Sequence, residues 1–181
     1  MIILSIDPGL VNMGVCLFDS DNFKILYANK ISLSANQKVF KKEGEHSLVD
    51  KILYLFTESA FKKYFEKAEI VIIEQQMKRT MLLVQYIMKT HCQTIKKECK
   101  IISPRSVKAK YKIGKNARKG TGAAVRGKKS NHSANKKMAI HFAKQMFPTF
   151  MSTVSVQKED DIADAVLQAA YYTTYILKAK K

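Results

Sequence analysis

Four acidic side chains stand where a folded chain can bring carboxylates together. Asp7 ends an apolar run over residues 1–6, and Glu74 ends a second such run. Asp161 and Asp164 are three residues apart at the start of a helical pattern, so they share one helix face. Carboxylates are the ligands that Mg²⁺ and Mn²⁺ prefer. The set therefore predicts two divalent ions about 4 Å apart, an arrangement that activates a water and stabilises the leaving oxygen in phosphodiester cleavage.

Each acid also has a structural explanation. Asp7 is followed by Pro8 and Gly9, a common turn sequence, and Glu74 could be an ordinary strand-end residue. Acids are frequent in the first turn of a helix, where the dipole favours them. Asp160 competes with Asp161 for the role of ligand, and the three-residue spacing to Asp164 favours Asp161.

The charge of the chain points to a polyanionic partner. Lys and Arg number 32 against 15 acids, a formal net charge of +17. Between residues 99 and 158 there are fifteen Lys or Arg and no Asp or Glu. No amphipathic helix pairs this charge with a broad apolar face, which argues against a membrane surface. Nucleic acid is favoured, and acids kept at the surface of a DNA-binding protein weaken binding unless metal neutralises them.

The length of 181 residues, 46% of them hydrophobic, suits one domain spanning the chain. No apolar run approaches the roughly twenty residues of a membrane span, and the N-terminus has no secretory pattern. The three cysteines are odd in number and lack metal-type spacing. Reduced thiols and an intracellular, reducing compartment are the expectation.

The elements that must position the acids follow from periodicity. Residues 1–7, 14–19 and 24–33 predict an antiparallel meander, and 70–74 and 100–102 predict two further strands. Helices are expected over 45–67, 81–97, 134–147 and 158–177, with Pro104 ending the last strand and Pro148 ending the third helix. The order predicts an α/β fold with a mixed five-stranded sheet and helices on both faces.

Residues 112–131 differ from the rest of the chain. They hold four of the seven glycines and seven basic residues, so this stretch is expected to be a loop that is mobile without a ligand. Its basic side chains are the predicted DNA contacts: Lys112, Lys115, Arg118, Lys119, Arg126, Lys128 and Lys129.

Three pieces of the sequence resemble, in order, the acidic motifs of RuvC-like Holliday junction resolvases of the RNase H-like (integrase) superfamily. They are Ser-Ile-Asp7-Pro-Gly-Leu-Val-Asn-Met-Gly, Ile-Ile-Glu74-Gln-Gln and Asp160-Asp161-Ile-Ala-Asp164-Ala. The Glu-Gln-Gln form and the Lys-Glu-Asp-Asp stretch look closest to the poxvirus and large-DNA-virus branch. The segment from Ser103 to Lys108 is similar to the family's segment after the fourth central strand.

The resemblance implies an RNase H-like fold and cleavage of four-way DNA junctions that leaves 5′-phosphate and 3′-hydroxyl ends. It also implies a basic active-site residue before the last motif, for which Lys136 is the first choice and Lys137 the second. Symmetric cutting needs two sites, so a twofold homodimer is expected. Two alternatives stay open: a nuclease of this fold acting on RNA or RNA–DNA hybrid, and a non-catalytic DNA-binding protein.

Overall fold

The structure is a computed structural model that describes the backbone of residues 1–33, 47–114 and 128–178, and the side chains of these residues except 128–132. Its centre is one mixed sheet in the order β3-β2-β1-β4-β5. The first three strands pair antiparallel, and β1, β4 and β5 run parallel. The strands are β1 (Ile2–Asp7), β2 (Met13–Asp19), β3 (Lys24–Ile31), β4 (Ile70–Glu74) and β5 (Glu98–Ile102).

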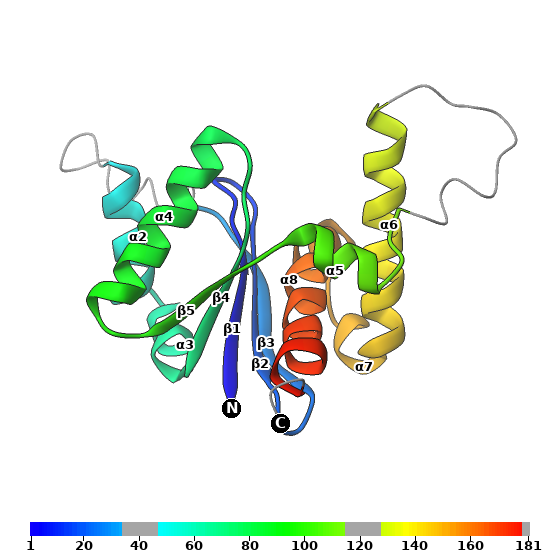
Figure 1. Cartoon of the computed structure of the whole chain (residues 1–181), viewed down its shortest axis with the longest axis horizontal. Helices are drawn as coiled ribbons and strands as arrows, with labels where there is room; N and C mark the ends of the chain where they lie inside the picture. Colours follow the sequence, from blue (N-terminus) through cyan, green and yellow to red (C-terminus); the bar gives the residue numbers. More distant parts are fainter. Residues whose placement is uncertain (34–46, 115–127, 179–181) are drawn as a thin grey trace, which may run out of the picture.

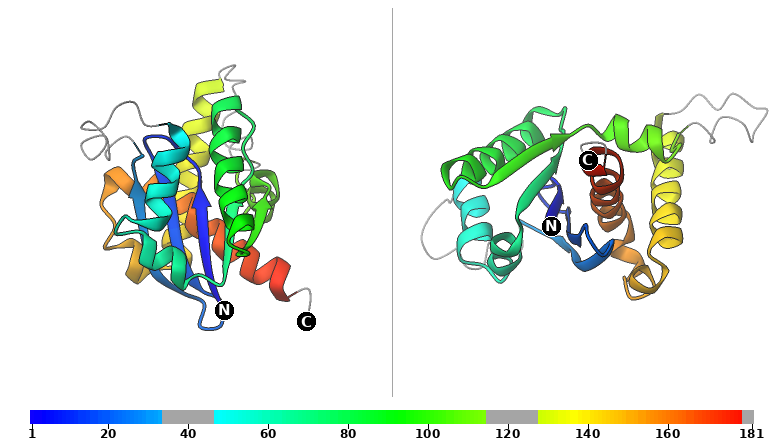
Figure 2. Two further views of the ribbon diagram at one scale, coloured as in Figure 1. Left: turned by 90° about the vertical axis from the view of Figure 1, so that its left-hand side faces the viewer. Right: turned by 60° about the horizontal axis from the view of Figure 1, so that its bottom comes forward.

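Helices cover both faces of this sheet (Figures 1 and 2). One face carries α2 (Leu48–Thr57), α3 (Lys62–Lys67) and α4 (Arg79–Thr94). The other carries α5 (Pro104–Lys110), α6 (Lys128–Met146), α7 (Pro148–Met151) and α8 (Glu159–Tyr171). The short η2 (Val156–Lys158) leads into α8, and a π-helical stretch, η3 (Tyr172–Leu177), continues it. The predicted fold class is confirmed.

Strand alternation divides the core into two layers. In β1, Ile3 packs on the α8 side of the sheet, whereas Leu4 and Ile6 pack on the α4 side. In β4, Ile72 faces α8 and Ile73 faces α4. These strands are buried on both faces, which explains why their sequences are continuous apolar runs instead of alternating ones.

The helix predicted over 45–67 is wrong, because it is two helices. Between α2 and α3, the side chain of Ser59 forms hydrogen bonds with the backbone that compete with those of a continuous helix. Its hydroxyl donates to the carbonyl of Leu55 (2.6 Å) and accepts from the amide of Phe61 (3.1 Å). Phe61 and Phe65 still reach the core, so the apolar spacing survives the break.

The predicted loop at 112–131 is wrong at both ends. Ile113 is only 7% exposed and packs in the α8-side core, while Gly114 takes a positive φ of 89° that suits glycine. At the other end, α6 begins at Lys128 and not near 134. Residues 115–127 lie outside the described residues.

Two prolines begin helices where the sequence predicted only interruptions. Pro104 does end β5, but it is also the first residue of α5, and Pro148 is the first residue of α7. Proline suits this position because its missing N–H would be unsatisfied in the first turn in any case. No helix within the described ranges is long and apolar enough to cross a membrane.

Candidate active site

Asp7 and Glu74 come together because β1 and β4 are parallel neighbours. The pairing aligns Ile6 with Ile73, so the two strands end at the same level with an acid each. Asp7 is two residues along from Ser5 and Glu74 two along from Ile72, which places both carboxylates on the face covered by α8. This register therefore brings the two strand-end acids to the same edge of the sheet.

Helix α8 brings the second pair of acids over the same strand ends, and it packs on β1 and β2. A Cβ at Gly14 would lie 1.9 Å from the carbonyl oxygen of Asp161, so only glycine permits this approach. Gly14 is paired with Asp7 across the β1–β2 ladder. The close contact therefore places the first turn of α8 beside Asp7, and the fully buried Ala165 lets the helix lie near the sheet.

The turn after Asp7 depends on a second glycine. A Cβ at Gly9 would lie 2.0 Å from the carbonyl oxygen of Asn12, so this residue must be glycine for the tight turn to close. The turn returns the chain directly into β2, whose residue Gly14 then lies against α8.

Mutual repulsion marks three of the acids as one cluster. Burial, followed by the negative charges of Glu74, Asp164 and Asp161, raises the pKa of Asp7 well above its ordinary value. Burial and the charge of Asp164 raise the pKa of Glu74 to about 7. Burial also raises the pKa of Asp164. Such shifts are typical of buried carboxylates that lie within electrostatic reach of one another, as in many functional sites.

Asp161 lies at the edge of this cluster. Its carboxylate is 3.5 Å from the ammonium of Lys30 on β3, and burial and the charge of Asp160 raise its pKa. The ammonium of Lys30 also donates to the carbonyl of Gln157 (3.2 Å), which ties β3 to the segment before α8. Asp161 is thus within electrostatic reach of Asp7 but already has a cationic partner.

Lys136, predicted from the resemblance, lies next to the acids. Its ammonium is 2.5 Å from the carboxylate of Asp160, and this hydrogen bond raises the pKa of Lys136, with smaller contributions from the charges of Asp161 and Asp164. Asp160 is therefore the direct partner of the lysine. The second choice, Lys137, is exposed.

Sequence reasoning missed Lys108. This half-buried residue lies on α5, and its positive charge acts on Asp7, Glu74 and Asp164, opposing the effect of burial on each pKa. Lys108 was missed because α5 was not predicted. If Pro104 is taken as the first residue of a helix, Lys108 lies on that helix, one turn further along. Two lysines, Lys108 and Lys136, therefore act on the acidic cluster.

The donor set fits a hard divalent cation. Asp7 and Asp164 accept no hydrogen bond and form no ion pair among the described residues, so their oxygens are available. Within the same residues, no three His, Cys, Asp or Glu side chains are close enough together to form a ready-made metal site. Asp7, Glu74, Asp161 and Asp164 are the residues that would hold such a cation.

The predicted DNA contacts are only partly placed. Lys112 is exposed and follows α5 with a positive φ of 54°. Lys128 and Lys129 belong to the first turn of α6, and their side chains are not described. The remaining four lie outside the described residues: Lys115, Arg118, Lys119 and Arg126.

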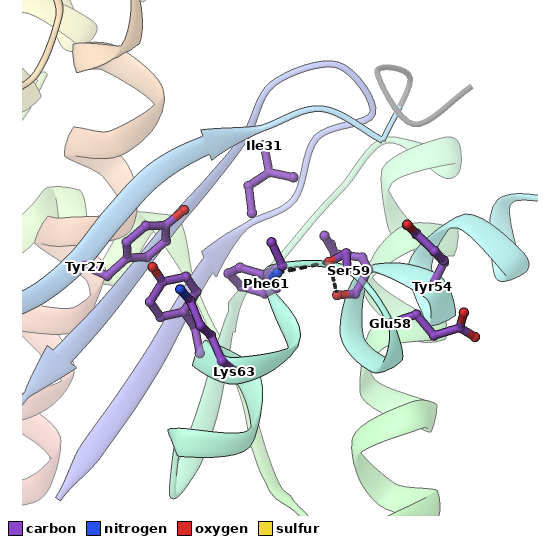
Figure 3. A pocket seen from close by; sticks show the side chains of 10 residues that line it. Tyr27, Ile31, Tyr54, Glu58, Ser59, Phe61 and Lys63 are labelled. Carbon is purple, nitrogen blue, oxygen red and sulfur yellow. Dashed lines mark hydrogen bonds between the residues drawn. The ribbon is translucent and has the colours of Figure 1, made fainter. Parts of the chain in front are cut away.

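A separate pocket of about 400 Å³ lies on the α4 side of the sheet, between β3 and the break from α2 to α3 (Figure 3). The ring of Tyr27 stacks on that of Tyr64 with centroids 3.8 Å apart. Because the acids face α8, this pocket is on the opposite side of the sheet and is not part of their site.

The sequence matches no family model and no curated protein. The fold is similar to that of solved Holliday junction resolvases. The fowlpox virus Holliday junction resolvase has a TM-score of 0.59 at 17% identity, over 98% of this chain and all of that one. The same resolvase with its substrate Holliday junction DNA gives 0.60 at 18% identity, over 98% and 99%. RuvC of T. thermophilus with a Holliday junction substrate gives 0.54 at 13% identity, over 95% and 94%. The expected fold class, a mixed five-stranded sheet with helices on both faces, is shared with these solved structures.

Proposed function

We propose that this protein is a divalent-metal-dependent endonuclease that resolves four-way DNA junctions and leaves 5′-phosphate and 3′-hydroxyl ends. The observation that carries the proposal is the convergence of Asp7, Glu74 and Asp164, with Asp161 at their edge, in a chain of net charge +17. A buried group of like charges is costly to keep unless a cation joins it. Phosphodiester hydrolysis is the chemistry that such a site serves best.

In this proposal the four acids would hold two divalent ions, Mg²⁺ or Mn²⁺. Ions held there would supply Lewis-acid chemistry, activating a water and neutralising charge on the leaving 3′ oxygen. Lys136, whose ammonium is fixed by Asp160, is placed to stabilise negative charge that develops on the phosphate. Lys108 adds a second positive charge, from α5.

Two features support a four-way junction as the substrate. The fold is shared with resolvases whose solved complexes contain Holliday junction DNA. The basic residues between 99 and 158 would contact phosphates, which makes affinity strongly dependent on salt. A homodimer is part of the proposal, since paired cuts in a symmetric junction need two active sites related by a twofold axis.

The test is a cleavage assay with a four-way junction, a linear duplex and an RNA–DNA hybrid, each in Mg²⁺ and with a chelator. We expect cuts in the junction alone, and only in Mg²⁺. Cleavage of the hybrid without junction preference would identify the RNA-processing alternative. Junction binding with no cleavage in Mg²⁺ or Mn²⁺ would identify a non-catalytic DNA-binding protein.

A further inference from the structure

Gln168 is a buried polar side chain on α8 that the proposed chemistry does not use. It is 1% exposed and lies one helical turn beyond Asp164. Its Nε2 donates to the carbonyl oxygen of Ile6 in β1 (3.4 Å) and to that of Ile72 in β4 (3.3 Å). One amide thus joins the helix to the neighbouring strands β1 and β4.

The two carbonyls that it contacts belong to the strand ends that carry the acids. Ile6 immediately precedes Asp7, and Ile72 is two residues before Glu74. The amide therefore bridges all three elements from which the cluster is assembled, a few residues from each carboxylate.

The orientation of this amide is set by its surroundings. If the group were reversed, Oε1 would face the two carbonyl oxygens, which cannot donate. In the observed orientation Oε1 is buried and has no hydrogen-bond partner among the described residues, and the hydroxyl of Ser5 in β1 is in the same condition. An unpaired buried acceptor is unfavourable, so an apolar side chain would serve packing alone at least as well.

We infer that Gln168 is a positioning residue that fixes the placement of α8 against β1 and β4, and so the spacing of the carboxylates toward a divalent ion. The inference rests on the proposed metal site. Besides the ion pair of Asp161 with Lys30 at β3, α8 contacts the sheet mainly through packing of apolar residues such as Ala165 and Ala169, which has no directional preference. The two donated hydrogen bonds are directional and sit beside the site.

The test is Gln168→Met, which keeps a similar shape and removes both donors. Mn²⁺ binding to the metal-free protein is measured by titration calorimetry, and the melting temperature is measured without metal. We expect Mn²⁺ affinity to fall about tenfold or more, as for other groups that orient metal ligands, while the melting temperature stays near that of the wild type. The matched control is Leu167→Met on the same helix, which should leave Mn²⁺ affinity unchanged.

Unchanged Mn²⁺ affinity in Gln168→Met would overturn the inference, whether or not the melting temperature moves. If that variant does not fold, Gln168→Asn carries the same test, because its shorter amide cannot span both carbonyls. Junction cleavage by the wild type is assayed alongside in Mn²⁺. No cleavage by the wild type refutes the proposed nuclease, whereas normal cleavage with equal Mn²⁺ affinities refutes only the role of Gln168.

Discussion

At the scale of residues, the acidic cluster stores unfavourable electrostatic energy when no cation is present. Burial and Asp164 raise the pKa of Glu74 from 4.5 to about 7. A raised carboxyl pKa means that the folded state holds the proton more tightly than the unfolded state does. The contribution to stability is therefore fully present below pH 4.5 and is lost as the pH rises through about 7.

Glu74→Gln should consequently stabilise the metal-free protein at pH 8, by on the order of 1–3 kcal/mol, while abolishing cleavage. Urea unfolding at pH 5 and pH 8 measures this, and the gain should be smaller at pH 5. The control is Glu66→Gln, an exposed acid on α3. A Glu74→Gln protein less stable than the wild type at pH 8 would show that the carboxylate is not under repulsion.

Lys136 and Lys137 are adjacent lysines, so substituting each in turn tests whether positive charge at the acids is needed for cleavage. Lys136 contacts Asp160 at the site, and Lys137 is exposed. Lys136→Ala should lower the single-turnover cleavage rate about a hundredfold, the usual effect of removing one group that stabilises transition-state charge. Lys137→Ala should cleave at nearly the wild-type rate. Equal losses in the two variants would mean that the lysines serve only general DNA affinity.

At the scale of elements, Gly14 determines how near α8 comes to the sheet. Gly14→Ala would set a methyl group 1.9 Å from the carbonyl oxygen of Asp161, so the helix must shift away from Asp7. We expect a loss of about 1–3 kcal/mol in unfolding free energy and a fall in cleavage larger than any fall in junction binding. Met13→Leu, at the adjacent buried position, is the control. Wild-type stability and activity in Gly14→Ala would refute this contact.

How much could be predicted from the sequence differs between elements for physical reasons. The strands carrying Asp7 and Glu74 were predicted because a doubly buried parallel strand must be apolar throughout. The break at Ser59 was missed because the apolar spacing continues through it. The contact of Asp161 with Lys30 and the bonds of Gln168 could not be predicted, since they depend on how α8 crosses the sheet and not on local pattern.

At the scale of the whole molecule, the surface of α4 is where a second copy is expected to bind. Leu83 and Tyr86, one turn apart on this helix, are 52% and 56% exposed, and Met77 in the preceding loop is 77% exposed. Exposed apolar side chains one turn apart on a helix suit an interface between protein chains. The proposed homodimer gives them a partner.

Leu83→Glu combined with Tyr86→Glu should therefore yield a monomer in sedimentation equilibrium, because charges would be buried across a self-complementary interface. Leu26→Glu, an exposed position on β3, is the control and should leave the dimer intact. A wild-type protein that sediments as a monomer, or a double variant that remains a dimer, would contradict this placement of the interface.

The most direct test of the proposed function is Asp7→Asn assayed on a four-way junction. The charges of Glu74, Asp164 and Asp161 all act on Asp7, and the substitution removes its charge while keeping its shape. We expect the variant to bind the junction as tightly as the wild type and to make no cuts in Mg²⁺. Cleavage at the wild-type rate in Mg²⁺ would contradict a metal-dependent nuclease built on these carboxylates.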